Sequence, residues 1–124
     1  MPATVAPLNP NGGRPAIELI IGNAHFASFD VSLFDANGEN PQKFGEGETD
    51  TIPDIFPIPG PTVTALNETS VLWRAVINSF TGAAGEEFSV TARIIQDGKV
   101  VASHNKTGLV TGKPPRGAFF LQVV

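Results

Sequence analysis

The sequence is marked first by the residue types that it lacks. Its 124 residues include no cysteine, no tyrosine and a single tryptophan. Without cysteine there is no disulfide framework, no thiolate metal site and no cysteine nucleophile. Lysine and arginine number 8 against 12 aspartates and glutamates, and the net charge of −4 argues against nucleic acid or an anionic membrane as a partner.

Long apolar runs are missing as well. Residues 1–15 have neither the basic start nor the apolar centre of a signal peptide. The longest apolar stretches, such as Leu19-Ile20-Ile21, are far shorter than the ~20 residues that cross a bilayer as a helix. We therefore expect a soluble protein without a membrane-inserted segment, and the sequence leaves its compartment open.

Alternation of apolar and polar residues predicts strands along most of the chain, and no segment has a helical stripe. The predicted strands are 15–21, 29–34, 62–66, 71–80, 88–95, 100–106 and 118–124. Turn signals separate them, so we predict an all-β fold: a single antiparallel β-sandwich of about seven or eight strands. The strand that carries Trp73 and the Asp97-Gly98 hairpin resemble those of immunoglobulin-like and jelly-roll sandwiches.

Two proline-rich segments depart from this pattern. Residues 1–14 hold three prolines and a Gly-Gly pair, which predict an extended arm without regular pairing, leaving 15–124 as the sandwich domain. Residues 39–61 are acidic, and prolines alternate with other residues near their end. This predicts a polyproline-like or edge segment that lies against the core, with a role as lid, edge cover or interface left open.

The Asp97-Gly98 turn is the strongest hairpin signal and predicts a type I′ turn. It would pair Ile95 with Val100 and Ile94 with Val101, so the hairpin tip is apolar on both faces. One core accounts for only one of these faces. The other is either covered by the arm or the proline-rich segment, or it forms an interface, for which Ile95 and Val100 are our candidate contacts.

The C-terminal strand supplies two further candidate contacts, Phe119 and Phe120. A strand that ends on two valines must be tied into a sheet, because it would otherwise aggregate. The arm and this strand are therefore either used in assembly, or they form an ordinary last strand and a segment that wraps its own domain.

A metal site is considered at the acidic turn that follows residue 34. Asp35, Asn37 and Glu39 place side-chain oxygens at alternate positions, as a Ca²⁺ site requires. Such turns also form for purely conformational reasons, because the side chains bond their own backbone. Apart from this weak calcium candidate, no cofactor is expected.

Few residues in the sequence suggest an enzyme. Asp30, His25 and His104 are the only residues that we single out for a small hydrolase or lyase, and the chain has no G-x-S-x-G elbow. Trp73 is the sole aromatic with a polar handle, and its apolar strand predicts a core position, which weakens sugar stacking.

These observations favour a non-enzymatic binding or assembly module that acts through another protein or through self-association. The alternative is a carbohydrate-binding, lectin-like module, with or without Ca²⁺. An enzyme is the least favoured interpretation.

Overall fold

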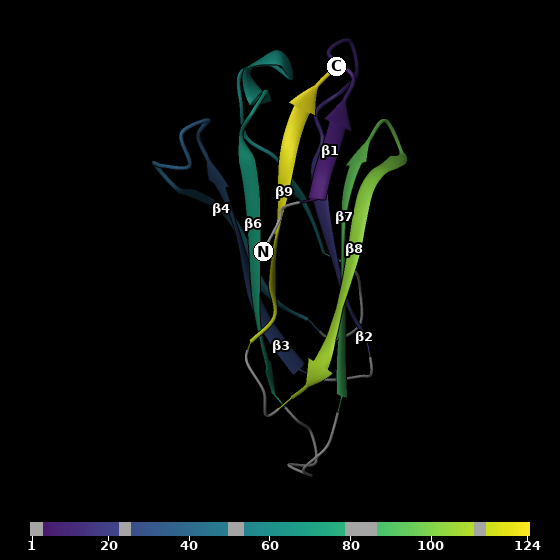
Figure 1. The fold of residues 1–124 in the computed structure, drawn as a ribbon. Coiled ribbons are helices and arrows are strands. Elements are labelled where there is room, and N and C mark those ends of the chain that lie inside the picture. The colour runs from purple at the N-terminus through teal and green to yellow at the C-terminus, as the bar shows by residue number, and fades with distance from the viewer. Residues whose placement is uncertain (1–3, 23–25, 50–53, 79–86, 111–113) are drawn as a thin grey trace.

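The computed structural model describes residues 4–22, 26–49, 54–78, 87–110 and 114–124, which form two packed β-sheets (Figure 1). Within these ranges the strands are β1 (Thr4–Leu8), β2 (Ala16–Gly22), β3 (Phe26–Phe34), β4 (Gln42–Thr49), β5 (Asp54–Pro57), β6 (Ser70–Asn78), β7 (Glu87–Gln96), β8 (Lys99–Leu109) and β9 (Arg116–Val123). One turn of 3₁₀ helix, η1 (Thr64–Leu66), precedes β6. Nothing helical in the described ranges has the length and apolar character needed to cross a membrane.

The sheets contain five and four strands, in the orders β1-β9-β6-β3-β4 and β5-β2-β7-β8. The predicted all-β sandwich is thus confirmed, with nine strands in the described residues instead of seven or eight. Two details differ from the prediction. Residues 64–66 form η1 and not a strand, and β1 pairs with β9 in parallel, so the larger sheet is mixed.

The N-terminal arm is where sequence reasoning failed most clearly. Residues 4–8 pair with residues 119–123 as β1, although they include Pro7. An edge strand tolerates proline, because one side of its backbone has no neighbour to bond. Beyond β1 the chain is held by the buried Gln96 side chain, whose Oε1 accepts from Asn9 N at 2.8 Å and whose Nε2 donates to the Asn9 and Gly13 carbonyls. The arm therefore packs on its own domain.

The acidic segment 39–61 supplies an edge strand to each sheet, β4 to the larger and β5 to the smaller. Its predicted edge position and contact with the core are confirmed: Ile58 is fully buried, and the Phe56 ring lies 5.9 Å from that of Phe29. Gly45 makes this contact possible, since a Cβ there would lie 2.4 Å from the Phe56 ring. The two sheets approach each other closely at this edge.

The core lies between the sheets and follows the predicted period of two. On β6 the side chains of Val71, Trp73 and Ala75 are buried, and on β7 Val90 and Ile94 face them. Burying each large apolar side chain contributes about 1.5–3 kcal/mol to stability relative to leaving it exposed. The residues between them point outward, so each sheet also has an outer face on which polar and apolar residues are free to serve other purposes.

Candidate binding surfaces

The β7–β8 hairpin has the predicted turn. Asp97 and Gly98 both have positive φ, 54° and 75°, as a type I′ turn requires. Ile95 pairs with Val100 as predicted. The next pair differs, because a register shift between Ile94 and Ile95 places Ile94 opposite Ala102 and not Val101. Such an irregularity depends on tertiary packing and has no signature in the sequence.

Ile95 and Val100 belong to a row that crosses the whole four-stranded sheet. The register places Pro57, Ala16, Ile95 and Val100 side by side on β5, β2, β7 and β8; we call this the hairpin row. It lies on the outer face, because the neighbouring residue Ile94 points into the core. Val100 is 52% exposed. The second apolar face predicted for the hairpin tip therefore exists and is not covered by any described part of the arm.

Next to the hairpin row the same outer face carries polar residues. Arg93 forms an ion pair with Glu18 at 3.4 Å. Farther along, the Asn105 side chain donates to Ser89 Oγ at 3.0 Å and to Thr91 Oγ1 at 2.9 Å. These polar residues separate the hairpin row from Leu109, a half-exposed apolar residue at the far end of β8.

The two phenylalanines predicted as contacts lie on opposite faces of β9, in the other sheet. Phe119 is fully buried and its ring stacks on that of His104, with centroids 4.4 Å apart. Its side chain is therefore enclosed by the domain and is not available to a partner in this structure. Phe120 points the other way and is half-buried. Neither residue joins Ile95 and Val100 in one surface.

His104 lies between the sheets in a fixed setting. Trp73 Nε1, which can only donate, bonds His104 Nε2 at 2.7 Å, so this nitrogen carries no proton. The proton of the neutral ring is then on Nδ1, 3.1 Å from Thr4 Oγ1. Burial, and next the charge of Lys106, lower the pKa of His104, which keeps the ring neutral. We interpret His104 as a structural link between β8, β6 and β1.

Asp30 and His104, the two described residues that were considered for catalysis, do not come together. The Asp30 carboxylate accepts from Arg74 Nε at 3.2 Å and Nη2 at 3.0 Å, on the outer face of the five-stranded sheet. His104 bonds Trp73, which points inward from the same strand as Arg74. Asp30 and His104 therefore lie on opposite sides of that sheet. His25 lies outside the described residues.

The acidic turn satisfies its own carboxylate. Asp35 Oδ1 accepts from the backbone N–H of Asn37 at 3.0 Å and of Glu39 at 2.9 Å, and Oδ2 accepts from Asn40 Nδ2 at 2.7 Å. These bonds, the one from Glu39 foremost, lower the pKa of Asp35. The described residues contain no group of three or more His, Asp or Glu placed to hold a metal ion. Hydrogen bonds from the turn's own backbone thus account for the position of Asp35 without a metal ion. Calcium binding by Asp35, Asn37 and Glu39 stays a prediction.

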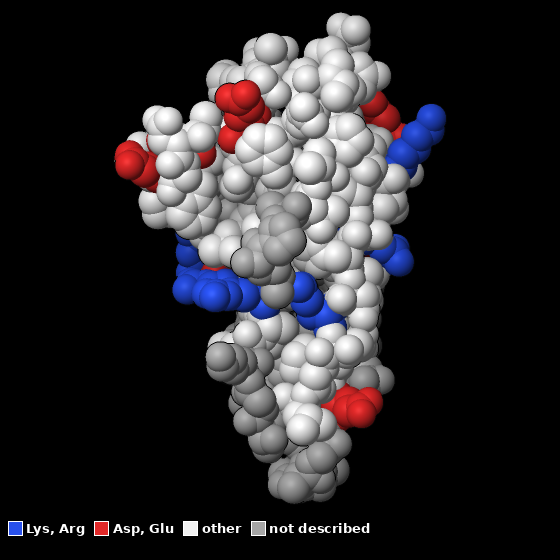
Figure 2. All heavy atoms as spheres, viewed as in Figure 1, with Lys and Arg blue, Asp and Glu red and all other residues white. Residues whose placement is uncertain are grey.

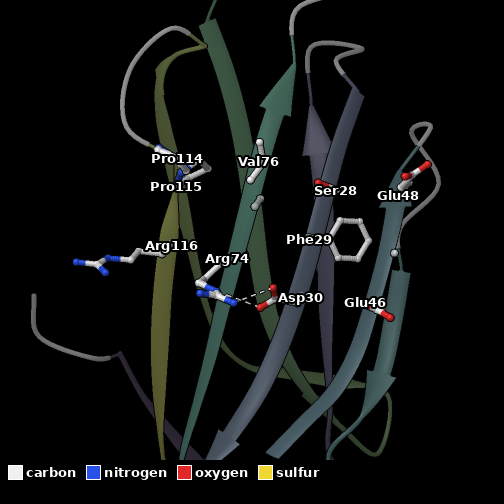
Figure 3. A pocket seen from close by; sticks show the side chains of 12 residues that line it. Ser28, Phe29, Asp30, Glu46, Glu48, Arg74, Val76, Pro114, Pro115 and Arg116 are labelled. Carbon is white, nitrogen blue, oxygen red and sulfur yellow. Dashed lines mark hydrogen bonds and ion pairs between the residues drawn. The ribbon is translucent and has the colours of Figure 1, made fainter. Parts of the chain in front are cut away.

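A large hollow that the sequence did not indicate lies on the outer face of the five-stranded sheet. It has a volume of about 870 Å³ and is lined by outward residues of β3, β4 and β6 and by the start of β9 (Figure 3). Arg74 and Asp30 meet at its centre, with Arg116 to one side and Glu46 to the other. Figure 2 shows most of the visible basic side chains at mid-height of the molecule, with one more at the upper right beside an acidic side chain.

The hollow is built on a charged row that only the register reveals. Arg116 pairs with Arg74, Arg74 with Asp30 and Asp30 with Glu46, across β9, β6, β3 and β4; we call these four residues the charged row. β3, β6 and β9 each carry a single charged residue and β4 carries three, so no strand on its own marks this row. Sequence analysis missed the site because its four residues come from four distant segments.

Comparison with protein-family models, with curated proteins and with solved structures found no match.

Proposed function

We propose that the protein is a non-enzymatic binding or assembly module, which recognises another protein or a second copy of itself through the hairpin row. The observation that carries this proposal is the continuity of the row: four apolar residues lie side by side across all four strands of the sheet. Contiguous exposed apolar surface with a polar border is typical of contact sites between proteins.

Exposure supports the same proposal. Val100 is 52% exposed at one end of the row, and Ile55, which lies next to Pro57 on the outward side of β5, is 55% exposed. Removing apolar surface from water contributes about 25 cal/mol per Å². A partner that covers both ends of the row also covers the half-buried Ile95 and Ala16 between them.

Carbohydrate binding remains the alternative from the sequence, and no contact in the described residues favours it. Trp73, the one side chain suited to stacking on a sugar, is fully buried. A glycan array tests this alternative directly.

Site-specific photocrosslinking tests the proposal. A photoreactive residue at position 100, in the hairpin row, should give discrete adducts in the cells that make the protein. The matched control is position 107, where exposed Thr107 lies on the same strand in the polar part of the outer face. Excess wild-type protein should compete for the adducts, and a Val100→Lys variant should not. Equal adducts at both positions, or none at position 100, would contradict the proposal.

A further inference from the structure

The charged row places like charges next to each other at both of its ends. Arg116 and Arg74 are directly opposite on β9 and β6, and Asp30 and Glu46 are directly opposite on β3 and β4. Neighbouring strands lie about 4.8 Å apart, and like charges directly opposite each other destabilise a sheet. Only the middle of the row, Arg74 with Asp30, is an opposite-charge pair within one strand spacing.

The two ends differ in how this repulsion is relieved. Glu46 forms an ion pair with Lys43 of its own strand, so the acidic end has a local counter-charge. Arg116 is exposed and has no ion-pair partner among the residues that the structure describes. The basic end thus leaves one guanidinium available, at the rim of the hollow and pointing away from Arg74 (Figure 3).

The order of charges is complementary to itself. Read from β9 to β4, the row is Arg, Arg, Asp, Glu. A second copy placed face to face, with a two-fold axis parallel to the strands between β6 and β3, presents the row in reverse. Every base then faces an acid: Arg116 faces Glu46 of the other copy, and Arg74 faces its Asp30. Symmetric interfaces of this kind use the same patch twice.

The neighbouring row fits this arrangement. Val76 pairs with Ser28 across the same two central strands, and it is 51% exposed on the same outer face. The axis passes between these two residues, so Val76 of each copy lies near the centre with the charges around it. An apolar centre with a polar rim is the usual anatomy of a protein interface. The hollow leaves room for the long side chains of the facing row and for bridging water.

We propose that the outer face of the five-stranded sheet binds a second copy of this chain through the charged row. Four strands make a face roughly 19 Å wide, and a contact of about the same length along the strands buries roughly 400 Å² per copy, about half of the ~800 Å² per partner in a standard interface. The dimer is therefore weak and depends on electrostatics. This inference does not need the proposed role of the hairpin row, which lies on the opposite outer face of the sandwich.

Sedimentation equilibrium at high protein concentration tests it. At about 0.01 M salt, where the Debye length is about 30 Å, the wild-type mass should approach twice that of the monomer; at about 0.15 M, where it is about 8 Å, dimerisation should weaken. Arg116→Glu and Glu46→Arg should each weaken self-association about tenfold or more, because the two-fold axis places each substitution in the interface twice. A strictly monomeric wild-type protein would overturn the proposal.

Mixing the two variants gives the decisive result. Arg116→Glu opposes acid to acid in its own dimer, and Glu46→Arg opposes base to base. In the mixed pair every base again faces an acid, so equal amounts of the two variants should form a heterodimer. Failure of the mixture to associate, while each variant melts like the wild type, would overturn the proposal.

The matched controls separate this surface from the other. Lys99→Glu changes the net charge as Arg116→Glu does, at an exposed residue of the β7–β8 turn, and should dimerise like the wild type. Val100→Lys, which tests the hairpin row, should also leave the dimer intact. If Val100→Lys abolishes dimerisation and Arg116→Glu does not, this inference fails and the function proposed for the hairpin row stands.

Discussion

The two faces of the five-stranded sheet differ in how their polar groups are paired. On β6, Trp73 points inward and its N–H is bonded to His104, whose other nitrogen is within hydrogen-bond reach of Thr4. The next residue, Arg74, points outward into a row where like charges adjoin. Burial requires that every polar atom has a partner, whereas water tolerates an unpaired charge. The inner face is therefore where stability is decided, and the outer face is free to carry recognition.

Truncating Trp73, on the inner face, should have the largest effect on the stability of the fold. Trp73→Ala removes a fully buried indole and leaves His104 Nε2 without its donor, so we expect unfolding to become easier by about 3–5 kcal/mol. Chemical denaturation measures this. Leu72→Ala, one residue along on the outer face, is the control and should cost much less. Equal losses at the two positions would erase the distinction between the faces.

Adding a methyl group at Gly117, on the inner face, should have the second largest effect on stability. A Cβ at residue 117 would lie 2.5 Å from His104 Nε2 and 2.7 Å from Trp73 Nε1, so Gly117→Ala should lower stability by about 1–3 kcal/mol through overpacking. At Gly47 the nearest atom, in the Phe29 ring, is 3.3 Å from such a Cβ, and Gly47→Ala should be milder. Thermal melts of the two variants compare them, and a neutral Gly117→Ala would count against the tight His104–Trp73 contact.

Acid should weaken the inner face in a defined pH window. The pKa of His104 lies below its ordinary 6.5, first because of burial and then because of Lys106. As pH falls below about 6.5 the unfolded chain takes up a proton before the folded one does, so stability is complete above that pH and declines towards the folded pKa. Urea unfolding of a His25→Gln protein should show this decline, and adding His104→Gln should reduce it. An unchanged pH dependence in the double variant would refute the assignment.

The Arg74–Asp30 ion pair on the outer face should contribute least to stability. Arg74 and Asp30 lie 3.0 Å apart, and their side chains are 62% and 25% exposed. We expect a coupling energy of about 0.2–1 kcal/mol that shrinks as salt is added. A double-mutant cycle with Arg74→Ala and Asp30→Ala measures it. A coupling as large as the loss at Trp73 would mean that the outer face also holds the fold together.

The same contrast explains what the sequence could predict. Buried positions such as Val71, Trp73 and Ile94 repeat every two residues, so their strands and the sandwich class were predictable. β4 was hidden, because Gly45 interrupts the alternation to make room for the ring of Phe56, and that contact is visible only in three dimensions. β1 was hidden because proline is excluded from central strands and not from edges.

The two candidate surfaces also differ in how far they could be predicted from the sequence. The Ile95–Val100 pair follows from a local two-residue turn, so half of the hairpin row could be read from the sequence. The charged row depends on the mutual register of four strands that are far apart along the chain. Register is set by which side chains share the core, and a single sequence does not contain that information in readable form.

The parallel pairing of β1 with β9 has a mechanical consequence. Thr4 lies opposite Phe119 and Leu8 opposite Val123, so the first and last strands run side by side in the same direction. Tension applied through the residues before β1 and after β9 pulls these strands past each other lengthwise. All the hydrogen bonds between them then share the load at once, instead of opening one by one as in a peeled hairpin. The edge contact formed by the proline-containing arm is therefore loaded in shear, and not by peeling, when the chain is pulled from its two ends.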